Sequence, residues 1–435
     1  MNCERLQRFR QQAYELLGKA KDATFELADA VMTTRHAECL GDFALNPLFR
    51  RQWSSAYEAL QDCQPEREKL MELYIQQMLD VSRPVLAVDH TGWMRPDAPT
   101  LKERTYQHQA GAISENRAVS VGFGYSSIAW IPENSGSWAL PLRHERITSW
   151  DTPISKAAFQ LQQVCKHLRQ RPIVLFDREY GCASLVNQTA EIAADKLMRL
   201  RSNLCLYSAP PAYSGRGRPS KHGAKFKLND PLSWWNADQT IELNDSKLGK
   251  LRLRQWHNLH FRNSAAHGMT LILLERLDIN RNHRQARPFW LVWIGEHQPE
   301  LENIWQQYLR RFAIDHWYRL IKQTLHWTLP QLSTPSQCDS WSDLMPLLTW
   351  QLWLAQELVR DYHLPWQKPL TNLTPGRVAQ SMFSLLFKIG TPACAPKLRG
   401  NSPGWPTGKS RQKKTRYPVV KKGFSRSQKQ PKPAA

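Results

Sequence analysis

The spacing of apolar residues along the chain changes in character at about residue 80. Before that point apolar residues recur at helical spacing, most clearly from Glu66 to Leu79, a segment that follows Pro65. We therefore expect an α-helical N-terminal domain at residues 1–80. In a basic protein such a domain could bind DNA, but its sequence contains no helix-turn-helix signature, and simple packing on the rest of the chain is equally compatible with it.

Short apolar runs separated by helical patterns dominate the next part of the chain. Val85–Val88 and Pro172–Phe176 are typical of buried strands, and each leads directly into an acidic residue, Asp89 or Asp177. Further elements are expected as strands at 119–131, 138–142 and 196–200 and as helices at 154–168 and 183–194. This order is that of an RNase H-like mixed sheet with flanking helices, so the expected fold class is α/β.

Residues 205–300 interrupt that alternation. The interruption begins with a polar loop and continues with β-like segments at 240–243, 250–254, 269–274 and 289–294. The RNase H-like domain would then consist of two parts, 81–204 and 301–395, separated by a β-rich insertion at 205–300. Covering helices are expected at 347–358 and 378–387. The composition from about Pro396 onward predicts a disordered basic C-terminal tail at 396–435.

One long helix is predicted from Tyr308 to Trp327, because this stretch contains no Pro or Gly. At 100° per residue, Tyr308, Arg311, Asp315 and Lys322 fall within an arc of roughly 60°. The stripe beside this arc is expected to face the core and holds Trp305, Leu309, Phe312 and Leu320. The polar arc is either a solvated face with ion pairs or a site that holds a metal ion and a phosphate backbone together.

Charge indicates which partners suit the chain. Its 435 residues carry a net charge of +21, which favours a polyanionic partner such as DNA. Twelve Lys and Arg residues lie between Lys397 and Lys432 without a single acid, so +9 remains for the body of the protein. Tail cations, including Lys413, Lys414, Lys421 and Lys422, are therefore expected to contact phosphates.

Several classes of protein are disfavoured. The eight Cys residues form no C-x-x-C pair, which favours free thiols in a reducing cytoplasm. No signal peptide is expected at the N-terminus, and the most apolar stretch, Pro346–Val359, is broken by polar residues, so no membrane span is expected. The sequence also lacks a P-loop and a dinucleotide-binding fingerprint, so no nucleotide cofactor is expected.

Acidic residues supply the candidate chemistry. Asp89 and Asp177 each follow a predicted buried strand, and Asp315 lies on the predicted helix. If the fold brings them together, their oxygens suit a pair of Mg²⁺ or Mn²⁺ ions. Two such ions can activate a water or a 3′-hydroxyl and stabilise the leaving oxygen in phosphoryl transfer.

Three motifs resemble those of a known family. They are VDHTGW at 88–93, LFDREYG at 175–181 and Tyr308-x2-Arg311-x3-Asp315-x6-Lys322. Together they resemble the DDE transposases of bacterial insertion sequences, most closely the branch with a β-rich insertion and a Tyr-Arg-Glu-Lys signature. The resemblance covers roughly residues 84–327, and the chain departs from it in having Asp315 where the family has Glu.

The resemblance implies roles for individual residues. Asp89 and Asp177, with Asp315, would be the catalytic residues and the ligands of two Mg²⁺ or Mn²⁺ ions. Tyr308, Arg311 and Lys322 would contact the DNA backbone near the cleaved phosphate. An aromatic residue of the insertion can receive a flipped base in related enzymes, and Trp256, Trp290 and Trp293 are candidates unless they pack in the core.

The resemblance also implies the function. The chain would be a transposase of the bacterial cytoplasm, associated with the nucleoid when bound to DNA, that binds the terminal inverted repeats of an insertion sequence and catalyses cleavage and strand transfer into target DNA. Synapsis of two ends implies a homodimer. Two alternatives stay open: a catalytically impaired, transposase-derived DNA-binding protein, and an RNase H-like nuclease without joining activity.

Two smaller features have two interpretations each. Arg216 and Arg218 lie in Arg216-Gly217-Arg218-Pro219, which resembles an arm that follows the minor groove of A·T-rich DNA but also suits a solvated surface loop. His90 could orient a ligand or a substrate phosphate beside Asp89, or it could be an ordinary surface histidine.

Overall fold

We describe the protein from a computed structural model. Its described residues are 3–108, 119–213, 215–246, 248–277, 289–297, 300–363, 365–397, 408 and 413–422.

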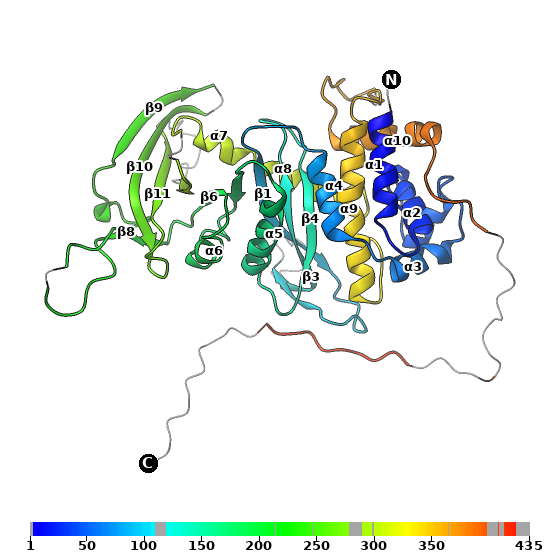
Figure 1. Cartoon of the computed structure of the whole chain (residues 1–435), viewed down its shortest axis with the longest axis horizontal. Coiled ribbons are helices and arrows are strands. Elements are labelled where there is room, and N and C mark those ends of the chain that lie inside the picture. Colours follow the sequence, from blue (N-terminus) through cyan, green and yellow to red (C-terminus); the bar gives the residue numbers. More distant parts are fainter. Residues whose placement is uncertain are drawn as a thin grey trace, which may run out of the picture.

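A single twisted sheet runs through the described part of the chain (Figure 1). Its strands lie in the order β2-β3-β1-β5-β6-β12-β11-β10-β7-β8, while β4 pairs with β3 and β9 pairs with β10. The strands are β1 (Val85–Met94), β2 (Thr105–His108), β3 (Val119–Trp130), β4 (Leu140–Ile147), β5 (Ile173–Phe176), β6 (Asp195–Arg199), β7 (Cys205–Tyr207), β8 (Lys225–Lys227), β9 (Gln239–Asp245), β10 (Gly249–Phe261), β11 (Met269–Arg276) and β12 (Phe289–Ile294). Strands β1, β5 and β6 are parallel, and β3 and β4 extend the sheet in antiparallel fashion.

The predicted fold class is confirmed, since the chain is a mixed α/β protein whose central part is consistent with an RNase H-like fold. The strands expected within residues 205–300 are present as β9 to β12. They continue the same sheet, because β12 pairs antiparallel with β6, with Leu291 opposite Arg199. Trp256, Trp290 and Trp293 are only 1%, 1% and 3% exposed, so in this structure they pack in the core.

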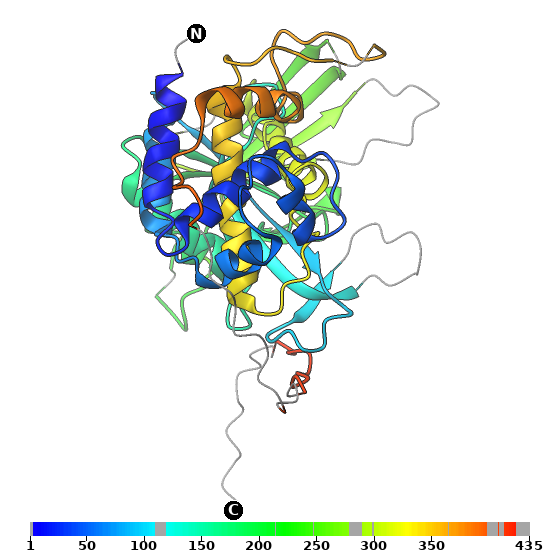
Figure 2. The same ribbon diagram turned by 90° about the vertical axis from the view of Figure 1, so that its right-hand side faces the viewer.

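Helices cover the sheet and gather at one end of the molecule. They are α1 (Glu4–Glu15), α2 (Lys21–Thr33), α3 (Trp53–Asp62), α4 (Arg67–Gln76), α5 (Pro153–His167), α6 (Ala183–Gln188), α7 (Ile304–Leu309), α8 (Phe312–Gln323), α9 (Pro335–Ala355) and α10 (Pro375–Ile389). The blue N-terminal helices pack beside α9 and α10, at the opposite end from the insertion (Figures 1 and 2). Among the described helices, none combines the length and the apolar character needed to cross a membrane.

A buried ion pair fixes the N-terminal helices to the C-terminal ones. The Arg10 guanidinium, 2% exposed, donates to both carboxylate oxygens of Asp29 at 2.7 and 2.8 Å. It also donates to the Gln351 side chain on α9 and to the Gly390 carbonyl at the end of α10. Helices from the two ends of the chain therefore share one core, and packing is the role that the structure gives to residues 3–80; DNA binding by them stays a prediction.

The prediction of one helix from Tyr308 to Trp327 is wrong. Helix α7 ends at Leu309, α8 runs from Phe312 to Gln323, and Arg310 and Arg311 lie between them. Both arginines are anchored to the central sheet at this interruption, Arg310 through the Ile131 carbonyl at 2.7 Å and Arg311 through Asp89. The predicted apolar stripe is split accordingly: Trp305 and Leu320 are buried, whereas Leu309 and Phe312 are 41% and 45% exposed.

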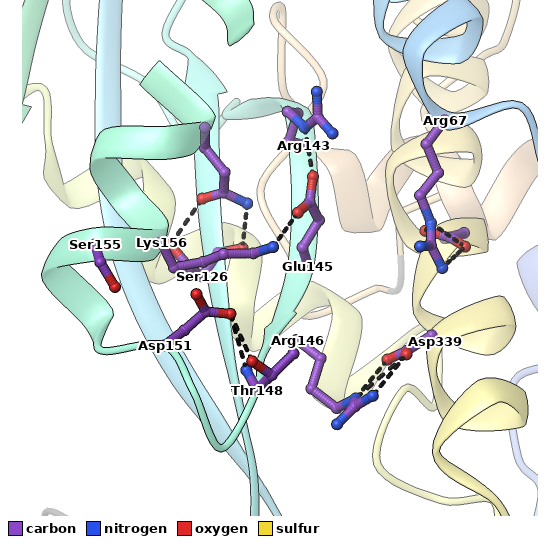
Figure 3. Close-up of polar contacts among 12 residues, drawn as sticks. Arg67, Ser126, Arg143, Glu145, Arg146, Thr148, Asp151, Ser155, Lys156 and Asp339 are labelled. Atoms are coloured by element: carbon purple, nitrogen blue, oxygen red, sulfur yellow. Dashed lines mark hydrogen bonds and ion pairs between the residues drawn. The ribbon is translucent and has the colours of Figure 1, made fainter. Parts of the chain in front are cut away.

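Charged side chains join β4 to the helices on either side of it (Figure 3). Arg146 of β4 contacts Asp339 of α9 at 2.9 Å, and Glu145 contacts Lys156 of α5 at 2.5 Å. Arg67 of α4 contacts Asp343 of α9 at 2.9 Å; burial raises the pKa of Asp343 to about 6 in spite of this partner. The charges of this cluster are compensated within it, which suits a structural role.

Part of the predicted basic tail lies against the sheet. Residues 413–422 run beneath the end of the sheet that holds β2 (Figures 1 and 2). The Val420 N–H donates to the Arg104 carbonyl at 2.8 Å, and Val420 forms a parallel bridge with Thr105 of β2. This portion of the tail is thus bound to the body of the protein.

The close approach of β3 to β1 generates a first prediction. A Cβ at Gly122 would lie 2.2 Å from the Trp93 carbonyl oxygen and 2.8 Å from the Met94 Cα, and neither backbone atom can move aside cheaply. Gly122→Ala should therefore reduce the free energy of unfolding by about 1–3 kcal/mol in urea denaturation. Gly376→Ala is the matched control, because a Cβ there would meet no described atom within 4 Å, and it should be neutral or stabilise by up to about 1 kcal/mol. Equal midpoints for the two variants would contradict this strand register.

Candidate active site

Strand register places Asp89 and Asp177 side by side. The parallel pairing of β1 with β5 ends at the pair Val88 and Phe176, so the next residue on each strand is an aspartate. Asp177 directly follows β5, as predicted. Asp89 does not end its strand, because β1 continues to Met94 as the antiparallel partner of β3, with Asp89 opposite Ser127. The two carboxylates thus lie at the carboxyl edge of neighbouring parallel strands, where α/β sheets commonly bind ligands.

Helix α8 brings charged side chains against the same strand. Arg311, at its N-terminal boundary, donates one guanidinium nitrogen to Asp89 at 3.1 Å and another to Asp315 at 3.3 Å. Lys322, near the other end of α8, donates to the Thr91 hydroxyl at 2.6 Å. Asp89 and Thr91 are two residues apart on β1 and share one face of the strand, so a single helix face meets a single strand face.

The carboxylates of this site destabilise one another. Burial raises the pKa of Asp89 to about 7, and the charges of Asp315 and Asp177 add to the rise, while Arg311 and the His90 N–H oppose it. Burial also raises the pKa of Asp315, again with a contribution from Asp177 and opposition from Arg311. Asp177 acts on both of the others, so the fold brings the three predicted acids into one electrostatic unit.

Sequence reasoning missed the partners of His90. Its Nδ1 lies 3.0 Å from the Tyr180 hydroxyl, and its Nε2 lies 3.5 Å from the Glu179 carboxylate. The side chain is 24% exposed, and burial lowers its pKa. His90 is therefore held beside Asp89 by two residues of the LFDREYG motif, which could have suggested this arrangement because Asp177 belongs to the same motif.

The residues predicted to contact DNA lie in different settings. Tyr308 is 1% exposed and packs edge-on against Phe289, and Arg311 is 6% exposed, so both are internal parts of the site. Lys322 is half-buried. Arg216 and Arg218 are exposed in a loop between β7 and β8, at the far end of the strand order from β1, and the structure does not bring them to the carboxylates. Lys413, Lys414 and Lys421 are exposed, whereas Lys422 is half-buried.

The donor set fits a divalent cation in charge and chemistry. Three carboxylates provide hard oxygen ligands. Burial, with a contribution from neighbouring carboxylates, raises the pKa of Asp89 and of Asp315, and Arg311 opposes this rise only in part. Within the described residues, no group of three His, Cys, Asp or Glu side chains converges closely enough to hold an ion as the side chains stand. Arg311 lies between Asp89 and Asp315, in the place where a shared cation would compete with it.

Comparison with known proteins agrees with this geometry. A family model described as DDE superfamily endonuclease matches residues 12–262, which is more than half of the chain. The matched segment contains Asp89 and Asp177 and ends before α7 and α8, so the signature around Asp315 lies outside it. No curated protein matches the chain. Domains of this family act on DNA and generally use divalent metal ions.

The raised pKa of Asp89 leads to a prediction about stability. The Asp89 carboxyl has a pKa of about 7 in the folded chain, against about 3.9 for an unfolded Asp. The protonated carboxyl therefore stabilises the folded chain at low pH, and this contribution is lost as pH rises between the two values. Asp89→Asn abolishes that loss. In EDTA, the Tm of Asp89→Asn minus that of the wild type should therefore increase from pH 5 to pH 8 in differential scanning fluorimetry. A constant difference would show that Asp89 ionises in the folded protein as it does in the unfolded chain.

Proposed function

The chain belongs to the DDE superfamily endonucleases, and from this premise we propose that it is a transposase. It would bind the terminal inverted repeats of a bacterial insertion sequence, cleave DNA at those ends and transfer the freed strands to target DNA, acting as a homodimer during synapsis. The observation that carries the proposal is the register of β1 and β5, which sets Asp89 beside Asp177 and within reach of the Arg311–Asp315 pair.

Asp89, Asp177 and Asp315 are the residues that would hold Mg²⁺ or Mn²⁺. Such ions, when bound, activate the attacking water or 3′-hydroxyl and stabilise the leaving oxygen. Arg311 keeps Asp89 and Asp315 at a fixed separation and partly neutralises them. Lys322 places a further positive charge on the same face through Thr91, where it would favour a phosphate that gains negative charge during reaction.

A second candidate is a DNA-binding protein with an impaired site. Asp315 is one methylene shorter than the Glu of the resembling family, a difference of about 1–1.5 Å in reach, whereas active constellations are usually held within about 0.5 Å. This candidate differs from the first in a measurable way, because binding to DNA would persist without cleavage in Mg²⁺ or Mn²⁺.

The test of the main proposal uses a duplex that carries the repeats flanking the coding region. Asp89→Asn and Asp177→Asn should each reduce cleavage of this duplex in Mg²⁺ by at least about 100-fold, since each removes a charged metal ligand and preserves shape. Affinity for the duplex, measured by fluorescence anisotropy, should change less than about threefold because the lost group does not contact the backbone. Cleavage by either variant near the wild-type rate would refute the assignment.

Asp315 is tested separately because it lies outside the matched segment. Asp315→Ala should abolish cleavage, and Asp315→Glu should retain at least part of it, since Glu keeps the charge and lengthens the arm. Glu302, an exposed acid just before α7, supplies the control, and Glu302→Gln should cleave normally. If Asp315→Ala cleaves and Glu302→Gln does not, the third ligand is Glu302. A rate for Asp315→Glu many times that of the wild type would identify the natural protein as an impaired transposase.

A further inference from the structure

The segment 413–422 lies along an edge that a sheet would otherwise expose. Strand β2 ends the path of paired strands, and such edges carry unpaired N–H and C=O groups that attract further strands. The segment uses this edge and the loop before it: the Val420 N–H donates to the Arg104 carbonyl at 2.8 Å, and the Tyr417 N–H donates to the Pro99 carbonyl at 2.9 Å. The ring of Tyr417 also lies 4.9 Å from the Lys102 ammonium.

Apolar and charged residues of the segment face different surroundings. Tyr417, Val419 and Val420 are half-buried against the body of the protein. Lys413, Lys414, Arg416 and Lys421 are exposed, and the segment contains no acid. This division is typical of a strand that docks through its backbone and apolar side chains while its cations stay available to a partner.

Lys422 extends the contacts of the docked segment to the loop between β4 and α5. Its ammonium donates to the Asp151 carbonyl at 2.8 Å, while the Asp151 side chain is used by Thr148 (Figure 3). The end of the segment is therefore fixed to the body of the protein as well as its middle.

From these contacts we infer that the docked segment 413–422 is a built part of the DNA-binding surface, which fixes a row of cations along the sheet edge. The inference rests on the proposed function, in that the polyanion is taken to be the DNA substrate. Cations whose positions are fixed along one edge attract a phosphate backbone and also determine where it lies. A disordered tether would supply the same charges without fixing where they act.

Docking is tested first, without DNA. Positions 105 and 420 face each other across a bridge, and neighbouring strands lie about 4.7–4.9 Å apart, within the range of a disulfide. Thr105→Cys/Val420→Cys should form an intramolecular disulfide in the full-length protein, identified by peptide mapping of the oxidised chain. Thr105→Cys/Lys413→Cys is the control and should not form one. No 105–420 disulfide, or one that joins two chains, would overturn docking within a chain.

The role of the segment in DNA binding is tested with a variant that disrupts its docking on the sheet edge and keeps every charge. Val420→Pro removes the N–H that donates to Arg104, whereas Val419→Pro is the matched control, because the Val419 N–H donates no backbone hydrogen bond to the described part of the chain. On a 30-bp duplex of arbitrary sequence, Val420→Pro should weaken binding about five- to tenfold and flatten the salt dependence, because fewer phosphates are contacted at once. Val419→Pro should bind like the wild type.

The remaining outcomes separate this inference from the proposed function. If the wild type binds DNA and Val420→Pro binds equally well, the tail is a free tether and the inference is wrong. We expect Lys421→Ala/Lys422→Ala to lose more affinity for DNA than Lys413→Ala/Lys414→Ala, which removes the same charge. Tighter binding by Lys421→Ala/Lys422→Ala would instead show that the segment inhibits DNA binding, and would overturn the inference. Failure of the wild type to bind any duplex would refute the proposed function, and the DNA role of the segment with it, even if the disulfide forms.

Discussion

The structure of the site depends on how its negative charge is compensated. Register forces Asp89 and Asp177 onto adjacent positions of two parallel strands, and α8 adds Asp315. Burial makes ionisation of Asp89 costly, the charges of Asp315 and Asp177 add to that cost, and the raised pKa of Asp89 records both. Arg311 is the internal cation that lowers it, and because its guanidinium contacts both strand and helix it also fixes α8 on the sheet.

The last strand of the insertion connects the insertion to the part of the sheet that carries the site. The strands of residues 205–300 extend the sheet beyond β6, and the last of them, β12, pairs with β6 itself. The chain therefore returns beside the parallel strands, and α7 and α8 are the next helices after β12 in the described part of the chain. Phe289, the first residue of β12, packs on Tyr308 of α7, so the last strand of the insertion and α7 support each other.

The sequence predicted the structure where local pattern determines it, and did not predict it where contacts between residues far apart in the chain determine it. Apolar runs ending in Asp89 and Asp177 identify two strands and their acids, but the extension of β1 through His90, Thr91 and Gly92 could not be predicted from polar residues. That extension exists because β3 supplies hydrogen bonds to the backbone and α8 supplies Lys322 to Thr91. The interruption between α7 and α8 was missed for the same reason, since Arg310 and Arg311 are good helix formers whose anchors lie on other elements.

The cations of the protein also affect how the acids of the site ionise. Because its pKa is raised, Asp89 holds its proton to higher pH than a free aspartate, so a divalent cation held there would compete with that proton. A DNA backbone brought near the same group pushes its pKa still higher and opposes that step. Cations held close to the carboxylates act against this effect in proportion to their proximity, whereas cations on a long tether contribute mainly to overall affinity. Arg311, buried beside Asp89 and Asp315, lowers the pKa of both, and this favours their ionised forms when DNA, itself an anion, lies nearby.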